Sequence, residues 1–403
     1  MNKSLLIHEF NIISKSKKNI FFSIFLAALL LSFCFIVLPN KQTTESFNPE
    51  IVSQELKELS VLQREREEKG FTGIVKFTGM PVYAMNEYYY KLHRNMITAF
   101  EDQDFKRFAL LRTHYLEGNQ WSFPADQTLF LKSPYPGKDS THLYLQTLLR
   151  YQGYLNQDIP ISYDMIEQKT ALQTLQNLLL GFTPYLIILC AIYFSSDVLI
   201  RDRQNQTILQ GFPLSWYRVL NIKTLVAFLF TFFVLTALTI VGMIIVSLQG
   251  GFGSFTIQMP VMITQKVFTL KDYDIISIAQ FLAKSLSFIP ILVYLFIRLN
   301  IVLSLLFKNE WIVLMISSLF LFSERLYFSR TLRELFGIEI SNFPQTYFEF
   351  GKVISGEKNF LVNIETVTYA KGLIVLISAI VIIECVLFIV SRIINKRRFY
   401  QKK

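Results

Sequence analysis

The chain has 403 residues, of which 52% are hydrophobic and 17% charged, and its formal net charge is +10. A soluble chain usually carries about 25% charged residues, so this composition argues against an ordinary soluble protein. The apolar content also excludes intrinsic disorder, and 16 glycines and 3 cysteines exclude a collagen-like or disulfide-rich secreted scaffold. What remains is an integral membrane protein with a sizeable polar part.

Apolar runs along the chain predict an all-α polytopic membrane protein. A helix needs about 20 mostly apolar residues to cross roughly 30 Å of hydrocarbon. The fifth run is short, so it either spans with help from its flanks or is half of a broken helix. The six predicted spans are 20–38, 172–196, 224–248, 275–307, 311–322 and 372–394.

Residues 1–19 are predicted to be a cytoplasmic segment, with four lysines before the first span. Such a basic segment before an apolar run also resembles a signal peptide. The run is long, however, and Leu38-Pro39-Asn40 offers no small-residue cleavage site. The first span is therefore predicted to be a retained anchor.

Residues 39–171, between the first two spans, are predicted to form a mainly helical extracytoplasmic domain. Its three histidines lack the tight spacing of zinc ligands, so ordinary surface or hydrogen-bonded histidines are favoured over a metal site. They are His93, His114 and His142. The expected elements are a helix from Asn48 to about Lys69, a short strand at 74–77, helices at about 84–117 and 141–156, and a helix from about 162 that runs unbroken into the second span.

One cytoplasmic loop has appreciable length, and it covers residues 197–223. Two short amphipathic pieces flank Gly211-Phe212-Pro213, which forces a turn. Ser215 can cap the second piece, which presents Trp216 and Tyr217. A short, charged and aromatic element at the membrane surface suits a lever on which a soluble partner pushes, and equally an interfacial loop with an aromatic belt.

Two further segments are expected outside the membrane. The loop 249–274 is either a partly re-entrant lip or a plain outer hairpin. In 323–371, apolar residues between Leu326 and Phe336 recur at helical spacing among arginines, which predicts an amphipathic helix at the outer interface.

Three charged residues fall well inside predicted spans. Glu384 lies near the middle of the last span, where a carboxylate must be protonated, paired or facing a wet cavity. It is interpreted either as part of a translocation path or gate, or as a structural hydrogen bond between helices. Arg298 and Lys284, both in the fourth span, are its candidate partners.

The positive charge indicates the orientation of the chain. The segments expected in the cytoplasm, counted with Arg392 at the end of the last span and the tail 395–403, hold 15 basic residues and four acids, whereas the rest of the chain is close to neutral. Basic residues stay in the cytoplasm when membrane helices insert, so both termini are predicted to be cytoplasmic. The excess charge is thus explained without a nucleic-acid partner.

Several catalytic motifs are missing from the sequence. The nearest approach to a phosphate-binding loop, Gly351 to Gly356, lacks the Lys-Ser or Lys-Thr that must follow the second glycine. The chain has no His-Glu-x-x-His or Gly-x-Ser-x-Gly motif, and its spans do not form two equivalent halves with paired broken helices. We therefore expect no catalytic site and no bound cofactor, and any energy from ATP has to come from another polypeptide.

Three short motifs accompany the order of the spans. They are Thr207-Ile208-Leu209 with Pro213-Leu214-Ser215 and Lys223, Leu305-Leu306-Phe307-Lys308, and Thr346-Tyr347-Phe348 with the Gly351 to Gly356 segment. With the order of spans, they resemble the membrane subunits of ABC-2-type (type V) ABC exporters over residues 1–38 and 172–403. In that family a first span, an outer domain, a coupling element after the second span and external re-entrant helices follow one another.

The resemblance implies a permease subunit in the plasma membrane of a bacterial cell, exporting a peptide, lipid or antibiotic through the lipid bilayer. It also implies a second membrane subunit, identical or related, and cytosolic ATPase subunits that bind ATP and Mg²⁺ and dock on residues 197–223. The coupling residues that it implies are Arg201, Asp202, Arg203, Gln204, Thr207, Leu209, Pro213, Trp216 and Arg218.

Two alternatives to an exporter stay open. In the first, the chain is a non-transporting relative in which an ATPase works a mechanical lever on the outer domain, as in a sensor. In the second, it is an ATP-independent carrier or a membrane enzyme.

Overall fold

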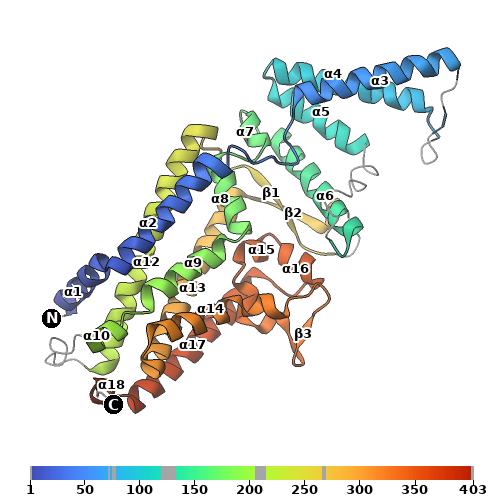
Figure 1. Cartoon of the computed structure of the whole chain (residues 1–403). Helices are drawn as coiled ribbons and strands as arrows, with labels where there is room; N and C mark the ends of the chain where they lie inside the picture. The colour runs from blue at the N-terminus through green and yellow to red at the C-terminus, as the bar shows by residue number, and fades with distance from the viewer. Residues whose placement is uncertain are drawn as a thin grey trace.

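The structure is a computed structural model of the chain, and it is mostly helical (Figure 1). Both termini lie at one end of a long helical bundle, here called the inner end, and the residues between the first two spans extend beyond the opposite, outer end (Figure 1). The residues that the structure describes are 2–70, 73–74, 79–118, 133–204, 215–265 and 269–400.

Among the described residues, five helical segments are long and apolar enough to cross a membrane. They overlap the first four predicted spans and the last one, so the chain is a helical membrane-embedded protein by length and composition. These segments are Lys17–Val37 (α2, Lys17–Ser32, continued by the π-helix η1, Phe33–Val37), Thr183–Asp202 (α9, Thr183–Ser195, and α10, Ile200–Gln204), Trp216–Gly250 (α12), Ile278–Phe307 (α13) and Tyr369–Ile393 (α17).

The remaining predicted span, 311–322, lies within helix α14 (Glu310–Tyr327), which is not one of these five. Charged residues stand in its first turn and near its end. Helix α14 nevertheless returns the chain along α9 and α13 from the inner to the outer end. Glu310 at its start lies 3.4 Å from Lys18 at the start of α2, and Glu324 near its end lies 2.7 Å from Lys358 beyond the bundle.

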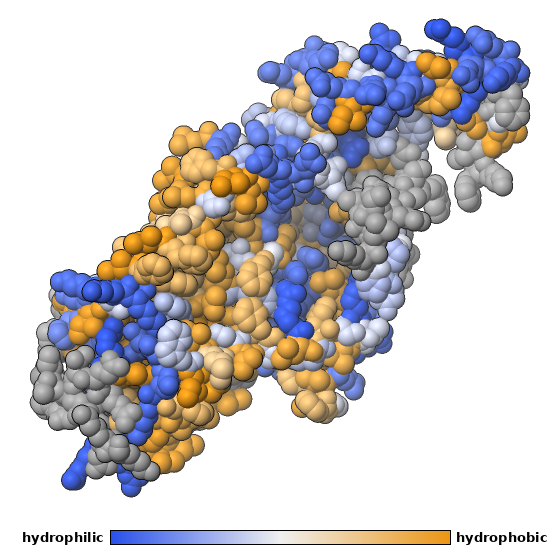
Figure 2. Space-filling model, in the orientation of Figure 1, coloured by the Kyte–Doolittle hydropathy of each residue, from blue (hydrophilic) through white to orange (hydrophobic). Residues whose placement is uncertain are grey.

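Two of the spanning helices form the centre of the bundle. In Thr183–Asp202 and α13, the rest of the chain buries 72% and 67% of the most apolar stretch of the span. In Lys17–Val37 and α17 the buried share is only 11%. Helices α2 and α17, at the periphery of the bundle, therefore present large side chains such as Phe21 and Ile374 to the surroundings. On the face shown in Figure 2, apolar residues form a band along the bundle, whereas hydrophilic residues predominate beyond its outer end. Lipid is the environment in which such a band is stable.

The predicted outer domain is helical, with more breaks than the sequence indicated. The helix expected from Asn48 is α3; the Asn48 side chain accepts hydrogen bonds from the first backbone N–H groups, and Gly70 ends the helix at a φ of 61°. The pattern at 84–117 is split by a turn at Gln103, and of the predicted strand only Ile74 is described, in a bridge to Pro81. The helices are α3 (Pro49–Lys69), α4 (Val82–Glu101), α5 (Phe105–Gly118), α6 (Pro136–Leu155), α7 (Tyr163–Ile166) and α8 (Ala171–Leu180).

The helix expected to run unbroken from about 162 into the second span was predicted wrongly. It is interrupted after α7, where Gln168 has a φ of 58°, and again at Gly181 between α8 and α9. Pro184 lies in the first turn of α9, and because proline has no N–H to donate, a helix cannot continue through it without losing a hydrogen bond. The second span therefore begins at α9, and α8 packs separately against α12 and α13.

The chain is not purely helical at its outer end. The loop 249–274 and the residues after it form a plain antiparallel hairpin of β1 (Gln258–Met262) and β2 (Tyr273–Ser277), which packs on α6. The prediction of an amphipathic helix from Leu326 to Phe336 was also wrong. Helix α14 ends at Tyr327, and a second hairpin, β3 (Glu334–Leu335) with β4 (Ile338–Glu339), turns at Phe336-Gly337, where both φ angles are positive. Short helical turns follow it: η5 (Ile340–Asn342), η6 (Pro344–Tyr347), α15 (Phe350–Ile354) and α16 (Glu357–Val362).

A buried carboxylate fastens the outer domain to the end of the first span. Glu45 lies 3.3 Å from Arg112 of α5 and 3.5 Å from Arg150 of α6, and the hydroxyl of Tyr151 donates to it at 2.7 Å. Burial alone would raise the pKa of Glu45, but the two guanidinium groups and this hydrogen bond hold it below its usual value. The carboxylate thus stays charged and joins α5 and α6 to the chain leaving η1.

Candidate functional site

Arg298 and Glu384 form an ion pair inside the helical bundle. Nε of Arg298 lies 2.6 Å from Oε1 of Glu384, which joins α13 to α17. The Arg298 side chain is 5% exposed and that of Glu384 25% exposed, so the pair is reached only from the carboxylate side. Lys284, the other candidate partner, precedes Arg298 in α13 and lies about 21 Å from it along the helix axis. Its Nζ faces the ring of Tyr369, 5.8 Å from the centroid, and the structure does not bring it to Glu384.

Each nitrogen of the Arg298 guanidinium group has a partner. Nε also donates to the hydroxyl of Tyr294 at 2.9 Å, Nη1 donates to Oγ1 of Thr224 at 3.0 Å, and Nη2 donates to Oδ1 of Asn221 at 2.8 Å. Tyr294 precedes Arg298 by one turn of α13, whereas Asn221 and Thr224 belong to α12. The guanidinium group thus ties α12 to α13 and α17.

Glu384 accepts two further hydrogen bonds. The hydroxyl of Tyr294 donates to Oε1 at 2.7 Å, and the hydroxyl of Tyr217, at the start of α12, donates to Oε2 at 3.0 Å. An unpaired charge in a bilayer costs several kcal/mol, and these contacts compensate both charges. We call this set the Arg298 network; its members are Tyr217, Asn221, Thr224, Tyr294, Arg298 and Glu384.

The sequence identified two members of this network and missed the rest. Tyr294 had a detectable signal, because residues four apart on a helix lie on the same face. Asn221 and Thr224 are three apart and share a face of α12 for the same reason, but nothing in the sequence shows that this face meets α13. Tyr217 was interpreted as part of the cytoplasmic loop, and its hydroxyl instead reaches into the bundle.

A second buried charge cluster lies at the inner end. Nζ of Lys223, in α12, lies 2.8 Å from Oε2 of Glu9 and 2.7 Å from Oδ2 of Asp202, and the three side chains are 1%, 2% and 7% exposed. Glu9 belongs to α1 (Asn2–Lys15), a helix that the sequence analysis did not predict and that packs along α12. We call these three residues the inner cluster. It holds α1 and the end of the second span against α12.

The residues implied to contact an ATPase differ in their accessibility. Asp202 is buried in the inner cluster, and Trp216 is buried with its Nε1 donating to the carbonyl oxygen of Ile394 at 3.0 Å. Both side chains are therefore buried against other residues of this chain, and the coupling role implied for them stays a prediction. Arg201 is half-buried, 3.9 Å from Asp197, and Arg218 is exposed. The other implied coupling residues cannot be placed: the side chains of Arg203 and Gln204, and all of Thr207, Leu209 and Pro213, lie outside the described residues.

In the part of the chain that the structure describes, no group of three or more His, Cys, Asp or Glu side chains, the histidines of the outer domain included, could hold a metal ion. His142 is buried instead. Its ring stacks on Phe360 of α16 with centroids 3.9 Å apart, and Nδ1 lies 2.6 Å from the hydroxyl oxygen of Tyr273. Burial, partly offset by Asp139, lowers the pKa of His142 to about 4.

Acidification from about pH 7.5 to about pH 5 is expected to weaken the packing of α6 on α16 by about 2 kcal/mol. Because the pKa of His142 is depressed from 6.5 to about 4, its contribution to stability is complete above about pH 6.5 and is lost as the pH falls towards 4. Hydrogen exchange of the α6 amides at the two pH values measures this change. His142→Phe should remove the pH dependence, whereas His114→Phe, at an exposed position, should keep it. An unchanged pH dependence in His142→Phe would contradict the assignment.

Comparisons of this chain with protein-family models, with curated proteins and with solved structures find no match.

Proposed function

We propose that the chain is the membrane subunit of an ATP-driven exporter, with six spans and with both termini and the inner end in the cytoplasm. The basic terminal segments at the inner end favour this orientation. Helix α14 is the fifth span in this proposal; its apolar middle lies against α9 and α13, and its charged residues lie near its two ends. The outer domain is then extracytoplasmic.

One observation carries the mechanism: the first turns of α12 belong to both charge networks. Lys223 binds Glu9 and Asp202, while its neighbours Asn221 and Thr224 bind Arg298. Successive residues of a helix point in different directions, so the same helical segment is held on one side by α1 and the cytoplasmic loop and on the other by α13. A push on residues 197–223 is therefore transmitted directly to the Arg298 network. Glu384 is 25% exposed, and in this proposal its carboxylate is a group of the network that a translocating substrate reaches.

The energy source in this proposal is a separate cytosolic ATPase with bound ATP and Mg²⁺, because the chain carries no phosphate-binding loop. A second membrane subunit completes the translocation path. The substrate class is a peptide, lipid or antibiotic, as the resemblance to ABC-2-type exporters implies. Among the implied coupling residues whose side chains the structure describes, Arg218 is the exposed one, and in this proposal it contacts the ATPase.

A mechanical lever without transport is the second candidate. It is favoured by the completeness of the Arg298 network, since all three guanidinium nitrogens already have partners within the chain. A network of this kind can switch between two packed arrangements without binding a substrate. In this case the motion of α12 would reach the outer domain through α8, which packs on both α12 and α13.

Reversal of charge at the exposed Arg218 is expected to weaken the association with the ATPase. Affinity purification of the full chain in mild detergent should recover an ATP-hydrolysing partner, and Arg218→Glu should lower its yield about fivefold or more because an exposed interfacial charge pair is lost.

Arg203→Ala should uncouple ATP hydrolysis from transport while insertion stays intact.

Lys57→Glu is the matched control, since this exposed lysine lies on α3 in the outer domain. Equal partner yields from wild type, Arg218→Glu and Lys57→Glu would remove residues 197–223 as the docking site. Substrate flux in proteoliposomes separates the exporter from the lever, because the lever predicts regulated ATPase activity without flux.

A further inference from the structure

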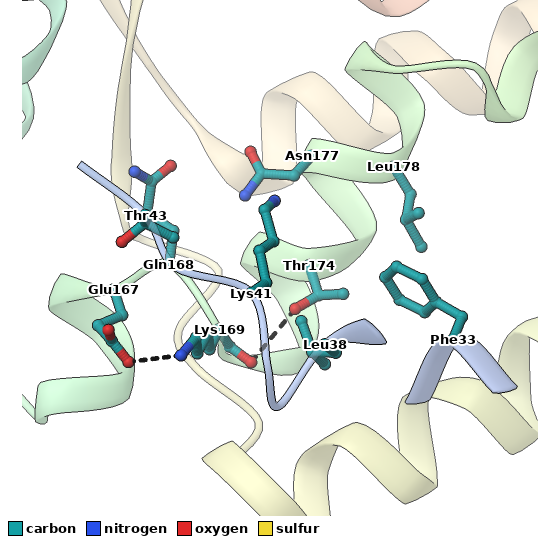
Figure 3. Close-up of a pocket in the computed structure, with 10 residues that line it drawn as sticks. All are labelled: Phe33, Leu38, Lys41, Thr43, Glu167, Gln168, Lys169, Thr174, Asn177 and Leu178. Carbon is teal, nitrogen blue, oxygen red and sulfur yellow. Dashed lines mark hydrogen bonds and ion pairs between the residues drawn. The ribbon is translucent and has the colours of Figure 1, made fainter. Parts of the chain in front are cut away.

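A pocket lies where the first span ends and the outer domain begins. Its apolar side is formed by Phe33 and Leu38 from the end of the span and by Leu178 of α8. Its polar side is formed by residues of the 41–43 segment, of the 167–169 loop after α7, and of α8. In Figure 3 the Phe33 and Leu178 side chains approach each other on one side, and Lys41 extends towards Asn177 on the other. The pocket is therefore amphipathic.

Three polar groups in this pocket have no partner among the described residues. Nζ of Lys41 makes no ion pair or hydrogen bond there, and neither do the side-chain amides of Gln168 and Asn177. Lys41 is exposed, and the two amides are half-buried. Donors left open around one pocket point to a ligand with acceptor oxygens.

The charge balance of the pocket favours an anion. Glu167 is its one carboxylate, and Nζ of Lys169 lies 2.8 Å from Oε2 while the Ser46 hydroxyl donates to Oε1 at 2.5 Å. The ion pair neutralises both charges, so the ammonium group of Lys41 gives the pocket a net positive charge. Ammonium donors bind phosphate oxygens well, and more strongly where water is partly excluded.

The position of the pocket selects the kind of anion. Phe33 and Leu38 belong to the last turns of an apolar span, so this depth is the boundary between hydrocarbon and headgroups. A ligand here has an acyl chain on the apolar side and its headgroup on the polar side. We propose that the pocket binds the phosphate headgroup of an anionic phospholipid, with Lys41, Gln168 and Asn177 as donors and with an acyl chain against Phe33 and Leu178.

This inference uses the membrane embedding of the first span and no transport role. Under the proposed orientation the lipid belongs to the outer leaflet. It would pack between the first span and α8, and so hold the outer domain at a set height above the bundle. Its test needs neither ATPase nor transport substrate, so failure of the exporter proposal leaves it intact.

Native mass spectrometry of the delipidated full chain, with added palmitoyl-oleoyl phosphatidylglycerol or phosphatidylcholine, measures the bound lipid. Wild type is expected to retain phosphatidylglycerol at about fivefold higher occupancy than phosphatidylcholine. Lys41→Glu is expected to lower phosphatidylglycerol occupancy about fivefold or more, because it places a like charge beside the phosphate. Phe33→Ala should lower the occupancy of both lipids, and Asn177→Ala is a second headgroup variant that keeps the charge unchanged.

Lys57→Glu, the same change on the exposed face of α3, is the matched control and should retain wild-type occupancy. Equal phosphatidylglycerol occupancy in wild type, Lys41→Glu and Asn177→Ala would overturn the proposal. Equal losses in Lys41→Glu and Lys57→Glu would also overturn it, because lipid retention would then follow net charge alone. Displacement of the lipid by millimolar inorganic phosphate would show an anion site without acyl-chain recognition, and this too would overturn the lipid assignment.

Discussion

Reversal of either charge in the Arg298–Glu384 pair is expected to abolish coupled activity, and reversal of both to restore part of it. Arg298→Glu and Glu384→Arg each place two like charges inside the bundle, and the loss of a partner for one buried charge costs about 3–5 kcal/mol. The double variant re-forms the pair in the opposite sense. The measurements are thermal unfolding in detergent and the ATPase activity of the purified complex.

Only partial recovery is expected, because the double variant carries its guanidinium group on α17, where it no longer reaches Asn221 and Thr224 of α12. Lys284→Glu is the control, since Lys284 lies outside the network on the same helix, and it should change neither stability nor activity markedly. If the double variant is no more stable or active than the single ones, the pair is not the interaction that the structure indicates.

Replacement of Lys223 by alanine is expected to release α1 from the bundle. Lys223 pairs with two buried carboxylates, so its removal takes away the ion-pair partner that Glu9 and Asp202 share, at a cost of about 3–5 kcal/mol. Hydrogen exchange and limited proteolysis of α1 should rise in Lys223→Ala. Activity of the complex should fall with it, because the same turns of α12 position Asn221 and Thr224 against Arg298.

The triple variant Lys223→Met, Glu9→Gln, Asp202→Asn tests the electrostatic origin of this effect. It removes all three charges at similar volume, and should recover much of the stability that Lys223→Ala loses. Lys15→Ala, at an exposed position of α1, should leave α1 protected. A normally protected α1 in Lys223→Ala would show that apolar packing alone holds this helix.

The predictions that depended on local pattern agree best with the structure. The Asn48 cap, the Gly70 stop and the helix between them are as expected, because the capping groups lie within a few residues of the backbone groups that they satisfy. The break at Gly181-Phe182 also had a local signal in Pro184, which the apolar periodicity of the second span obscured. The amphipathic pattern between Leu326 and Phe336 was misleading: helix α14 ends at Tyr327, and Leu326 and Phe336 are 82% and 93% exposed, so their spacing marks no buried helix face.

For the candidate sites, too, the predictions that rest on local sequence agree best with the structure. Glu384 and Arg298 were found because any ionisable residue in an apolar run needs a partner. Asp202 and Trp216 were given a coupling role by the resemblance alone, and that role stays a prediction; the structure adds that α1 and the residues after α17 bury both side chains. The lipid pocket had no sequence signal, since Phe33, Lys41 and Asn177 are brought together from three separate segments.

The sequence by itself determined that this is a helical membrane protein, where most of its spans lie and which charges inside them require partners. These properties follow from apolar length and from the cost of burying charge, and both are sums over neighbouring residues. Only the tertiary structure decided which partners those charges have and that α12 links the two charge networks. Contacts between helices depend on the side chains that distant segments present to one another, and no local pattern encodes that choice.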